Sequence, residues 1–358
     1  MSIEVASNMT FGHQEVVRGA DGSTVGYVPW HNIAANAEPR EYRDGHDLAR
    51  VLGLDWYAFP DALSRATNAG HTREGFAATP AIPFRGVFRS DTGVCLGTVG
   101  KQWHAIQNYQ LCDLAVSLSR IMPISINAGG ILGEGEKVWV MADLGTRQIG
   151  NRVLRSGEPD AINQHVLFCT AHNGRGAAKV IPVPNECGCA NALAGIIKSR
   201  GKFGWSISHT MNAEKRLEKA KRGLFESTRW YDALFTQLES LNEEPFTEKD
   251  MVIFADQLIN ETRGVIEEVV NARTERQVEQ QEGDKATLVR LFSEGATNIG
   301  ETKLDALKAV TEFISHHRRR AQRGGDQTRA ALARLEDEWT GSHTIQMRRR
   351  ALNILQKG

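Results

Sequence analysis

The hydrophobic pattern of the chain changes its period near residue 210, and this change limits the possible folds more than any other feature. Before this point, short apolar runs are separated by Gly, Asp and Asn turns, which is typical of β-strands. From Asn212 onward, apolar residues recur mostly at intervals of three or four, which is typical of buried helix faces. The sequence therefore predicts an α+β protein, with a β-rich core that contains a hairpin and helices, followed by a helical C-terminal region. We expect an N-terminal arm with short helices over 1–80, an α+β core domain over 81–245 and the helical region over 246–358.

Turn residues and capping signals predict the individual elements of the core. Asp91-Thr92-Gly93 indicates a hairpin turn, and Asn108 stands where a helix N-cap belongs. Pro182 and Pro184 are expected to end a strand. The expected strands are 84–90, 94–99, 137–142, 164–170, 178–183 and 203–208, and the expected helices are 45–52, 60–69, 108–118 and 185–198.

The second half of the chain reads as a series of helices. Pro245 breaks the first of them, and Thr247 to Asp250 resembles a capping box that opens the next. Residues 275–285 are polar, so we expect a solvated helix end and a turn there. Further helices are expected near 286–293, 303–322, 326–338 and 343–356.

The neutral net charge hides strong local charge. The chain has 43 Lys and Arg residues against 43 Asp and Glu residues. Its consecutive segments nevertheless carry −4 over 1–146, +8 over 147–222, −10 over 223–301 and +6 over 302–358. Net neutrality therefore does not exclude a polyanionic partner.

The sequence favours a cytoplasmic protein without bound metal or cofactor. No stretch of about 18 apolar residues is present, and the first residues lack the basic and apolar regions of a secretory signal. The five cysteines are an odd, sparse set, which fits reduced thiols better than a disulfide framework. Cys187-Gly-Cys189 lacks the two further ligands that a zinc site requires.

Common catalytic motifs are absent. Gly100-Lys101 and Gly201-Lys202 are not followed by the Ser or Thr of a phosphate-binding loop. We find no dinucleotide fingerprint, no nucleophile elbow and no zinc-protease helix. This favours a protein without catalytic activity and leaves an enzyme with an unrecognised site as an alternative. The residues considered for that site are His104, His165, His172 and Asn191.

Three basic and aromatic constellations remain as candidate binding sites for nucleic acid. The first spans 100–108, where a strand gives way to a helix; the second is the loop and strand at 173–179; the third, at 198–222, holds eight basic residues and two acidic ones. Basic groups neutralise phosphates and aromatic rings stack on bases. The candidate residues are Lys101, Trp103, His104, Arg175, Lys179, Lys198, Arg200, Lys202, Trp205, His209, Lys215, Arg216, Lys219 and Arg222.

Each constellation also has a purely structural interpretation. Trp103 fits a core position, and Gly174 and Gly176 are what a plain hairpin turn requires. On the helix after 212, Lys215, Lys219 and Arg222 share one face, which a solvated surface without a ligand explains equally well.

The order of these segments resembles a known family. Three motifs carry the resemblance: the string Gly-Lys-Gln-Trp-His-Ala-Ile-Gln-Asn at 100–108, the Cys189-Ala-Asn191-Ala-Leu193 helix, and Ser208-His209-Thr210 before a basic helix. Together with the Ala-Val-Thr-Glu-Phe-Ile-Ser-His string at 309–316, they resemble the phage/plasmid-like proteins of domain-of-unknown-function family 932. The similarity runs from about Trp30 to His316. The family usually has a Thr beside the Asn of the Cys-x-Asn helix, whereas Ala190 and Ala192 flank Asn191 here.

The resemblance implies mobile-element biology in a bacterial cytoplasm. The layout of a hairpin, a helix and a following basic segment is also similar to the single-strand annealing proteins of phage recombination, such as RecT, Redβ and their Rad-type counterparts. Those proteins form rings or filaments that hold single-stranded DNA in a basic groove without hydrolysing nucleotides. This similarity is an analogy of layout.

Our leading hypothesis is therefore a non-catalytic, oligomeric protein that binds and anneals single-stranded DNA in phage or plasmid recombination. An alternative is a protein-interaction module, in which the acidic segment of one subunit pairs with the basic segments of the next.

Overall fold

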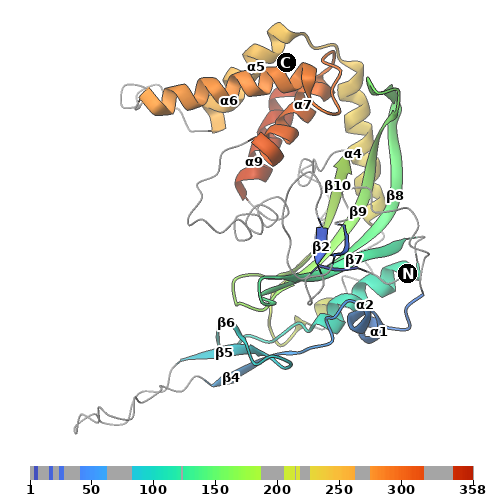
Figure 1. Cartoon of the computed structure of the whole chain (residues 1–358), viewed down its shortest axis with the longest axis vertical. Coiled ribbons are helices and arrows are strands. Elements are labelled where there is room, and N and C mark those ends of the chain that lie inside the picture. Colours follow the sequence, from blue (N-terminus) through green and yellow to red (C-terminus); the bar gives the residue numbers. More distant parts are fainter. Residues whose placement is uncertain are drawn as a thin grey trace.

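The structure is a computed structural model, and the α+β class is confirmed. It describes residues 4–6, 16–18, 24–27, 41–62, 83–121, 124–186, 205–213, 215–217, 226–262, 275–317 and 342–357. Strands occupy the first part of the chain and helices the last (Figure 1). Among the helices of these described ranges, none has the length and apolar character needed to cross a membrane.

A six-stranded sheet forms the centre of the molecule. Its strands follow the order β1 (Glu4–Ala6), β7 (Ser125–Leu132), β8 (Lys137–Val153), β9 (Pro159–Ala171), β10 (Ala178–Glu186) and β11 (Trp205–Ile207). Only β1 and β7 pair in parallel; the other neighbours are antiparallel. The long hairpin β8–β9 runs from the small sheet at one end of the molecule to the helices at the other (Figure 1).

A small sheet and two helices pack against one end of the long hairpin. The sheet has the order β4 (Ala58–Ala62), β5 (Phe84–Arg89) and β6 (Cys95–Gly100), and the helices are α1 (Gly45–Val51) and α2 (Asn108–Ser119). Leu111, Leu114 and Leu118 of α2 share a buried core with Val140 and Phe168 of the large sheet. Strands β2 (Val16–Arg18) and β3 (Thr24–Tyr27) form a separate pair within the N-terminal arm.

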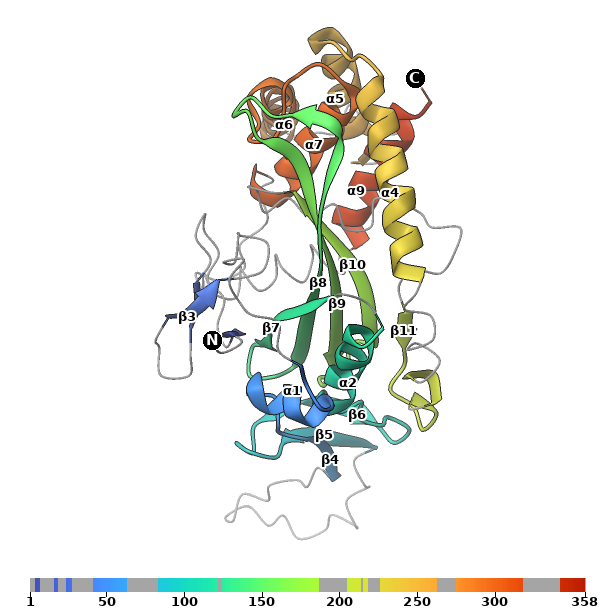
Figure 2. The same ribbon diagram turned by 90° about the vertical axis from the view of Figure 1, so that its right-hand side faces the viewer.

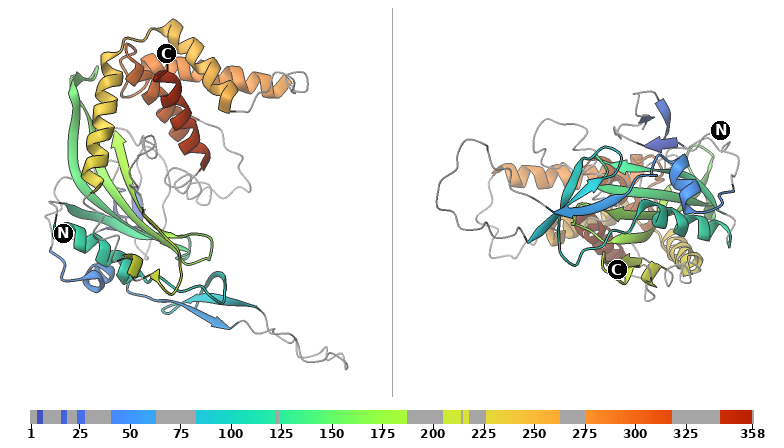
Figure 3. Two further views of the ribbon diagram at one scale, coloured as in Figure 1. Left: turned by 180° about the vertical axis from the view of Figure 1, so that it is seen from behind. Right: turned by 90° about the horizontal axis from the view of Figure 1, so that it is seen from below.

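The helical region forms a second core at the other end of the hairpin. It comprises α4 (Glu226–Glu243), α5 (Glu248–Thr262), α6 (Glu275–Glu294), α7 (Lys303–Glu312), a π-helical turn at Phe313–His317 and α9 (Ser342–Leu355). Ile149 and Ile162, near the far end of β8–β9, belong to this core. Helix α4 lies alongside the long strands (Figure 2, and from behind in Figure 3). Its apolar side chains pack with the C-terminal helices, although the sequence placed this segment in the core domain.

A buried network of charges joins the far end of the hairpin to the helices. Arg152 on β8 bonds to Asp160 at 2.7 Å and also to Asp305 on α7, while Lys308 on α7 donates to both oxygens of Asp160 at 2.7 Å. All four side chains are at most 2% exposed. Burial alone raises the pKa of Asp305, but Arg152 and backbone N–H groups outweigh it and hold that pKa below its usual value.

Several sequence predictions are confirmed. The hairpin at β5–β6 and the helix α1 lie where expected, and Gly93 has φ +69° in the turn, a conformation that favours glycine. Thr247 and Asp250 form the expected reciprocal cap at the start of α5, with Thr247 N donating to the Asp250 carboxylate at 2.9 Å.

Other predictions are wrong. Residues 58–62 form the strand β4 instead of the start of a helix at 60–69; Pro60 is tolerated because β4 is an edge strand. Strand β10 continues through Pro182 and Pro184 to Glu186. In the described chain, its outer neighbour β11 pairs only with 178–180, so no ladder bond to β11 is lost there.

Two helix boundaries also differ. Helix α6 runs unbroken through 275–285, where we expected a solvated end and a turn. Lys285 supports it by bonding Glu282 on the same helix and Asp256 on α5. Gln107, not Asn108, is the N-cap of α2, because the Asn108 side chain is buried and bonds elsewhere. The expected helix at 326–338 and most of the one at 185–198 lie outside the described residues.

Candidate nucleic-acid interface

The loop between β6 and α2, residues 101–107, is held in one conformation from two sides. From the small sheet, one guanidinium nitrogen of Arg85 donates to the carbonyl oxygens of Lys101 and Trp103, each at 2.9 Å. The Gln107 side chain pairs with the backbone of Ala58 on β4, accepting at 3.0 Å and donating at 2.9 Å. The backbone around Lys101 is therefore fixed by the strands on which it rests.

His209 holds the same loop from the other side. The backbone N–H of His104 donates to the His209 carbonyl at 3.2 Å, and His209 Nδ1 lies 3.1 Å from the His104 carbonyl oxygen. Nε2 lies 3.4 Å from the Thr170 hydroxyl on β9. A neutral ring bonds the loop in either tautomer: with its proton on Nδ1 it donates to the His104 carbonyl and accepts from Thr170, and with its proton on Nε2 its Nδ1 accepts from the Ile106 N–H at 3.3 Å. Burial lowers the pKa of His209, which favours this neutral form.

A second buried histidine lies beneath this contact. His172 Nε2 donates to Asn108 Oδ1 at 2.8 Å, and Asn108 Nδ2 donates to the carbonyls of Leu54 and Trp56 at 3.1 and 3.0 Å. Asn108 thereby links α2, the end of β9 and the segment before β4. Within the described chain, His172 Nδ1 is buried without a hydrogen-bond partner. Burial and, secondarily, His209 lower the pKa of His172 to about 3.

This buried histidine predicts a loss of stability in acid. An unfolded histidine binds a proton below about pH 6.5, whereas folded His172 stays neutral down to about pH 3. The unfolded state therefore gains protons first, and stability falls as the pH drops through this window. Between pH 7 and pH 5 we expect this one group to remove about 2 kcal/mol of the free energy of unfolding.

Urea denaturation of the wild type and of His172→Gln at both pH values measures this effect. The pH-dependent loss should be about 2 kcal/mol smaller in the variant, because glutamine does not titrate. Equal losses in the two proteins would show that His172 does not control the acid sensitivity.

The three basic constellations come together at this loop. The β9–β10 turn crosses β6 so closely that a side chain at Gly97 would lie 2.7 Å from the Asn173 backbone. Gly174, with φ +75°, approaches the Thr98 carbonyl in the same way. Strand β11 pairs with β10 at Lys179 and leads into His209. Segments 101–107, 173–179 and 205–217 thus meet at one place in the molecule.

Four exposed basic residues lie on the segments that meet here, and we refer to them as the basic corner. They are Lys101, Arg175, Lys215 and Arg216. Lys179 is half-buried and projects from the opposite face of the sheet, because its neighbours Ala178 and Val180 face the core that contains α2. None of the four forms an ion pair with another described residue, whereas Arg89, Arg147, Arg152 and Lys285 all do. The basic corner therefore presents cations that the described chain does not neutralise.

Trp103 and His209 pack against each other in the structure. Their rings stack on each other at 4.9 Å, with 16° between the planes. His209 is 5% exposed, and its contacts position the loop backbone. The side chain of His104 is exposed beside them.

The other candidate residues are not placed. Lys198, Arg200, Lys202, Lys219 and Arg222 lie outside the described residues. Trp205 is described only as part of the β11 backbone.

Of the residues considered for an enzyme site, His165 lies apart from the loop at 101–107. His165 lies five residues before Thr170 on β9, about 17 Å along the strand. It is buried beside Tyr231, whose hydroxyl donates to the His165 carbonyl at 2.7 Å. Burial lowers the pKa of His165, with Asp143 opposing that shift. Asn191 is outside the described residues, and among those described no three His, Cys, Asp or Glu side chains group as metal ligands.

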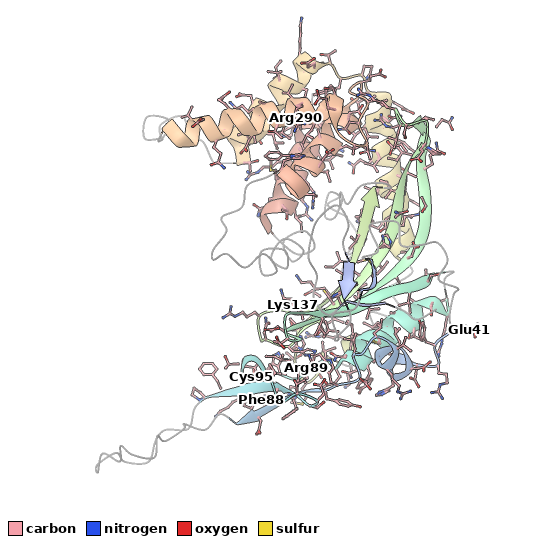
Figure 4. The ribbon with its side chains drawn as sticks, in the orientation of Figure 1. Glu41, Phe88, Arg89, Cys95, Lys137 and Arg290 are labelled. Carbon is pink, nitrogen blue, oxygen red and sulfur yellow. The ribbon has the colours of Figure 1, made fainter. Side chains whose placement is uncertain are left out.

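Sequence reasoning missed a set of aromatic residues beside the basic corner. Tyr57 and Phe59, before and on β4, and Phe84 and Phe88 on β5 lie on the outer side of the small sheet. Phe88 is paired with Cys95 across the hairpin, and both appear on that sheet in Figure 4. The sequence contains a signal for this arrangement. Tyr57 and Phe59 are two residues apart and Phe84 and Phe88 are four residues apart, and an even spacing places side chains on the same face of a strand.

Comparison with known proteins identifies a family without an assigned activity. The family model described as "Domain of unknown function (DUF932)" matches residues 95–338. No curated protein and no solved structure matches the chain.

Proposed function

The chain belongs to the DUF932 family of unknown function, and we propose that it binds single-stranded DNA and promotes annealing without catalysis. The observation that carries this proposal is the basic corner. Three segments separated by up to about a hundred residues bring their cations to one place, held by buried contacts to His209. Unneutralised cations grouped on a rigid support suit a polyanion.

The annealing role rests on layout. A hairpin, a helix and a basic segment follow one another here as in the single-strand annealing proteins of phage recombination. The motifs at 100–108 and 208–210, which resemble phage/plasmid-like proteins, contain parts of the corner and its support. We therefore propose a role in phage or plasmid recombination within a bacterial cytoplasm.

Self-association is part of the proposal. Helices α5 and α6 form an open groove in which Val252 and Ile253 are 53% and 67% exposed. Acidic side chains line the same groove: Glu248, Asp256, Glu282 and Glu294. Lys285 pairs with Asp256 and Glu282, and Arg290 pairs with Glu294, so the edges of the groove carry both charges. An exposed apolar strip with charged edges suits a complementary amphipathic surface of a second copy.

Binding of a labelled single-stranded oligonucleotide at increasing salt tests the proposed function. Neutralising one phosphate of a single strand contributes a slope of about −0.7 to the plot of log affinity against log salt. Four contacts at the basic corner give a slope of about −2.8, so affinity should fall roughly fiftyfold between 50 and 200 mM salt. Fluorescence anisotropy measures the affinity, and light scattering of the same samples measures the size of the particle.

Binding that does not change with salt, or no binding at low salt, would contradict the proposal. A particle whose size depends on salt but not on oligonucleotide would favour the protein-interaction module instead.

A further inference from the structure

The small sheet has one buried face and one aromatic face. Ala58 on β4 and Val87 on β5 are fully buried. Leu96 and Val99 on β6 are buried as well, with exposed fractions of 4% and 3%. Side chains alternate between the two faces of a strand. On β4 and β5, the neighbours of Ala58 and Val87 therefore point outward.

Four aromatic rings occupy the outward side, and we refer to Tyr57, Phe59, Phe84 and Phe88 as the aromatic face. Tyr57, Phe59 and Phe84 are 46%, 42% and 53% exposed, and Phe88 is half-buried. The rings of Phe59 and Phe88 lie 6.0 Å apart across the β4–β5 pair. Phe59 and Phe88 stand side by side because they are paired across neighbouring strands. Phe84 lies on the same face of β5, two side-chain positions from Phe88, and the ring of Tyr57 lies 6.2 Å from that of Tyr109 on α2.

This exposure needs an explanation. A large aromatic side chain buries roughly 150–250 Å² when it is covered, so grouping several on a solvated face sacrifices considerable stabilisation. Contiguous exposed apolar patches of this kind mark interaction sites.

The surroundings of the aromatic face indicate what covers it. Phe84 pairs with Gly100, and Lys101 of the basic corner is the next residue. Arg85, between the aromatic residues of β5, points inward and fixes the Lys101 and Trp103 carbonyls. The aromatic face and the basic corner therefore share one rigid support. A ligand that spans both must offer flat apolar groups and a chain of negative charges.

We propose that the aromatic face is a platform on which unpaired bases of the bound DNA strand stack while the basic corner holds its phosphates. This inference rests on the proposed function. It adds a physical reason why the protein would bind single-stranded DNA in preference to a duplex. In a duplex the faces of the bases are already stacked on each other, so the platform cannot reach them. Because every base has a flat face, stacking of this kind is tolerant of sequence.

The test compares Phe59→Ala/Phe84→Ala with the wild type for a single-stranded oligothymidine and for a duplex of equal length. Both side chains are substantially exposed, so the fold should survive; circular dichroism and thermal melting check this. The double variant should lose about tenfold to a hundredfold in affinity for the single strand, with little change for the duplex. Phe59→Tyr/Phe84→Tyr should retain the affinity, because tyrosine stacks equally well.

The matched control is Val153→Ala/Val278→Ala, which truncates two exposed apolar side chains, at the far end of β8 and on α6, outside the groove between α5 and α6. It should bind the single strand like the wild type. Wild-type affinity in a folded Phe59→Ala/Phe84→Ala protein would overturn the platform, as would an equal loss for the duplex. The platform would also be wrong if the Phe59→Ala/Phe84→Ala protein lost self-association but not DNA binding. That result would mean that the aromatic face binds a second copy of the protein.

The platform and the proposed function fail in different ways. If the wild type binds with the expected salt dependence but the aromatic variants bind equally well, the platform is wrong and the proposed function stands. If the wild type does not bind single-stranded DNA, both are wrong.

Discussion

Lys101→Glu/Lys215→Glu/Arg216→Glu should bind single-stranded DNA about a thousandfold more weakly than the wild type at low salt. These three exposed residues come from two segments that His209 joins, and none has a described ion-pair partner to lose. Each reversal removes an attraction to phosphate and adds a repulsion, together worth at least about a tenfold change in affinity. Fluorescence anisotropy with the labelled oligonucleotide measures the change.

The control for this experiment carries the same change in net charge elsewhere. Arg229, Lys249 and Lys357 are exposed residues of the helical region and its C-terminal end, and reversing all three leaves the basic corner intact. This variant should lose much less affinity, since screened charges far from the strand contribute little. Equal losses in the two triple variants would mean that net charge alone, and not the basic corner, governs binding.

Asp160→Ala should be the most destabilising of the changes considered for this protein, costing about 3–5 kcal/mol of the free energy of unfolding. It leaves Arg152 and Lys308 buried with Asp305 as the remaining carboxylate of the network. Unpaired buried charge is costly because the protein interior solvates it poorly. Since the network joins the β8–β9 hairpin to α7, the helical region should also become more sensitive to proteolysis.

Urea denaturation measures this change, and Asp232→Ala is the control. Asp232 pairs with Arg147 at 2.9 Å, but its side chain is 71% exposed, so its loss should cost less than about 1 kcal/mol. Equal costs for Asp160→Ala and Asp232→Ala would show that the buried network does not stabilise the junction.

Local elements of the fold could be predicted because their signals are local. Asp91-Thr92-Gly93 specifies a turn, and Thr247 and Asp250 specify a helix start, whatever the rest of the chain does. The full length of β8 and β9 could not be predicted in this way. Their far ends are defined by contacts such as Asp160 with Lys308, which are 148 residues apart.

The candidate site was predictable in its parts but not in its arrangement. Lys101, Arg175 and Lys215 stood out within separate basic segments. Their proximity depends on His209 bonding to His104, a contact 105 residues apart that no local pattern encodes. The residue type of Trp103 suggested base stacking, but it could not show that the ring of His209 stacks on it within the protein.

The aromatic face was missed for a different reason. Interpreting Pro60 as the start of a helix separated Tyr57 and Phe59 from any strand, so their shared face with Phe84 and Phe88 was not visible. A proline on an edge strand can still pair with the neighbouring inner strand. Pro60 pairs with Val87 in this way, so the proline does not exclude a strand at 58–62.

Ultraviolet cross-linking of a single-stranded oligonucleotide to the wild-type protein, with the attached peptides identified by mass spectrometry, tests most directly where DNA binds. We predict that the cross-linked peptides come from residues 57–62, 84–104, 173–179 and 205–217, and that excess salt suppresses them together. Cross-links concentrated in 226–262 or 275–317, or unaffected by salt, would contradict binding at the basic corner.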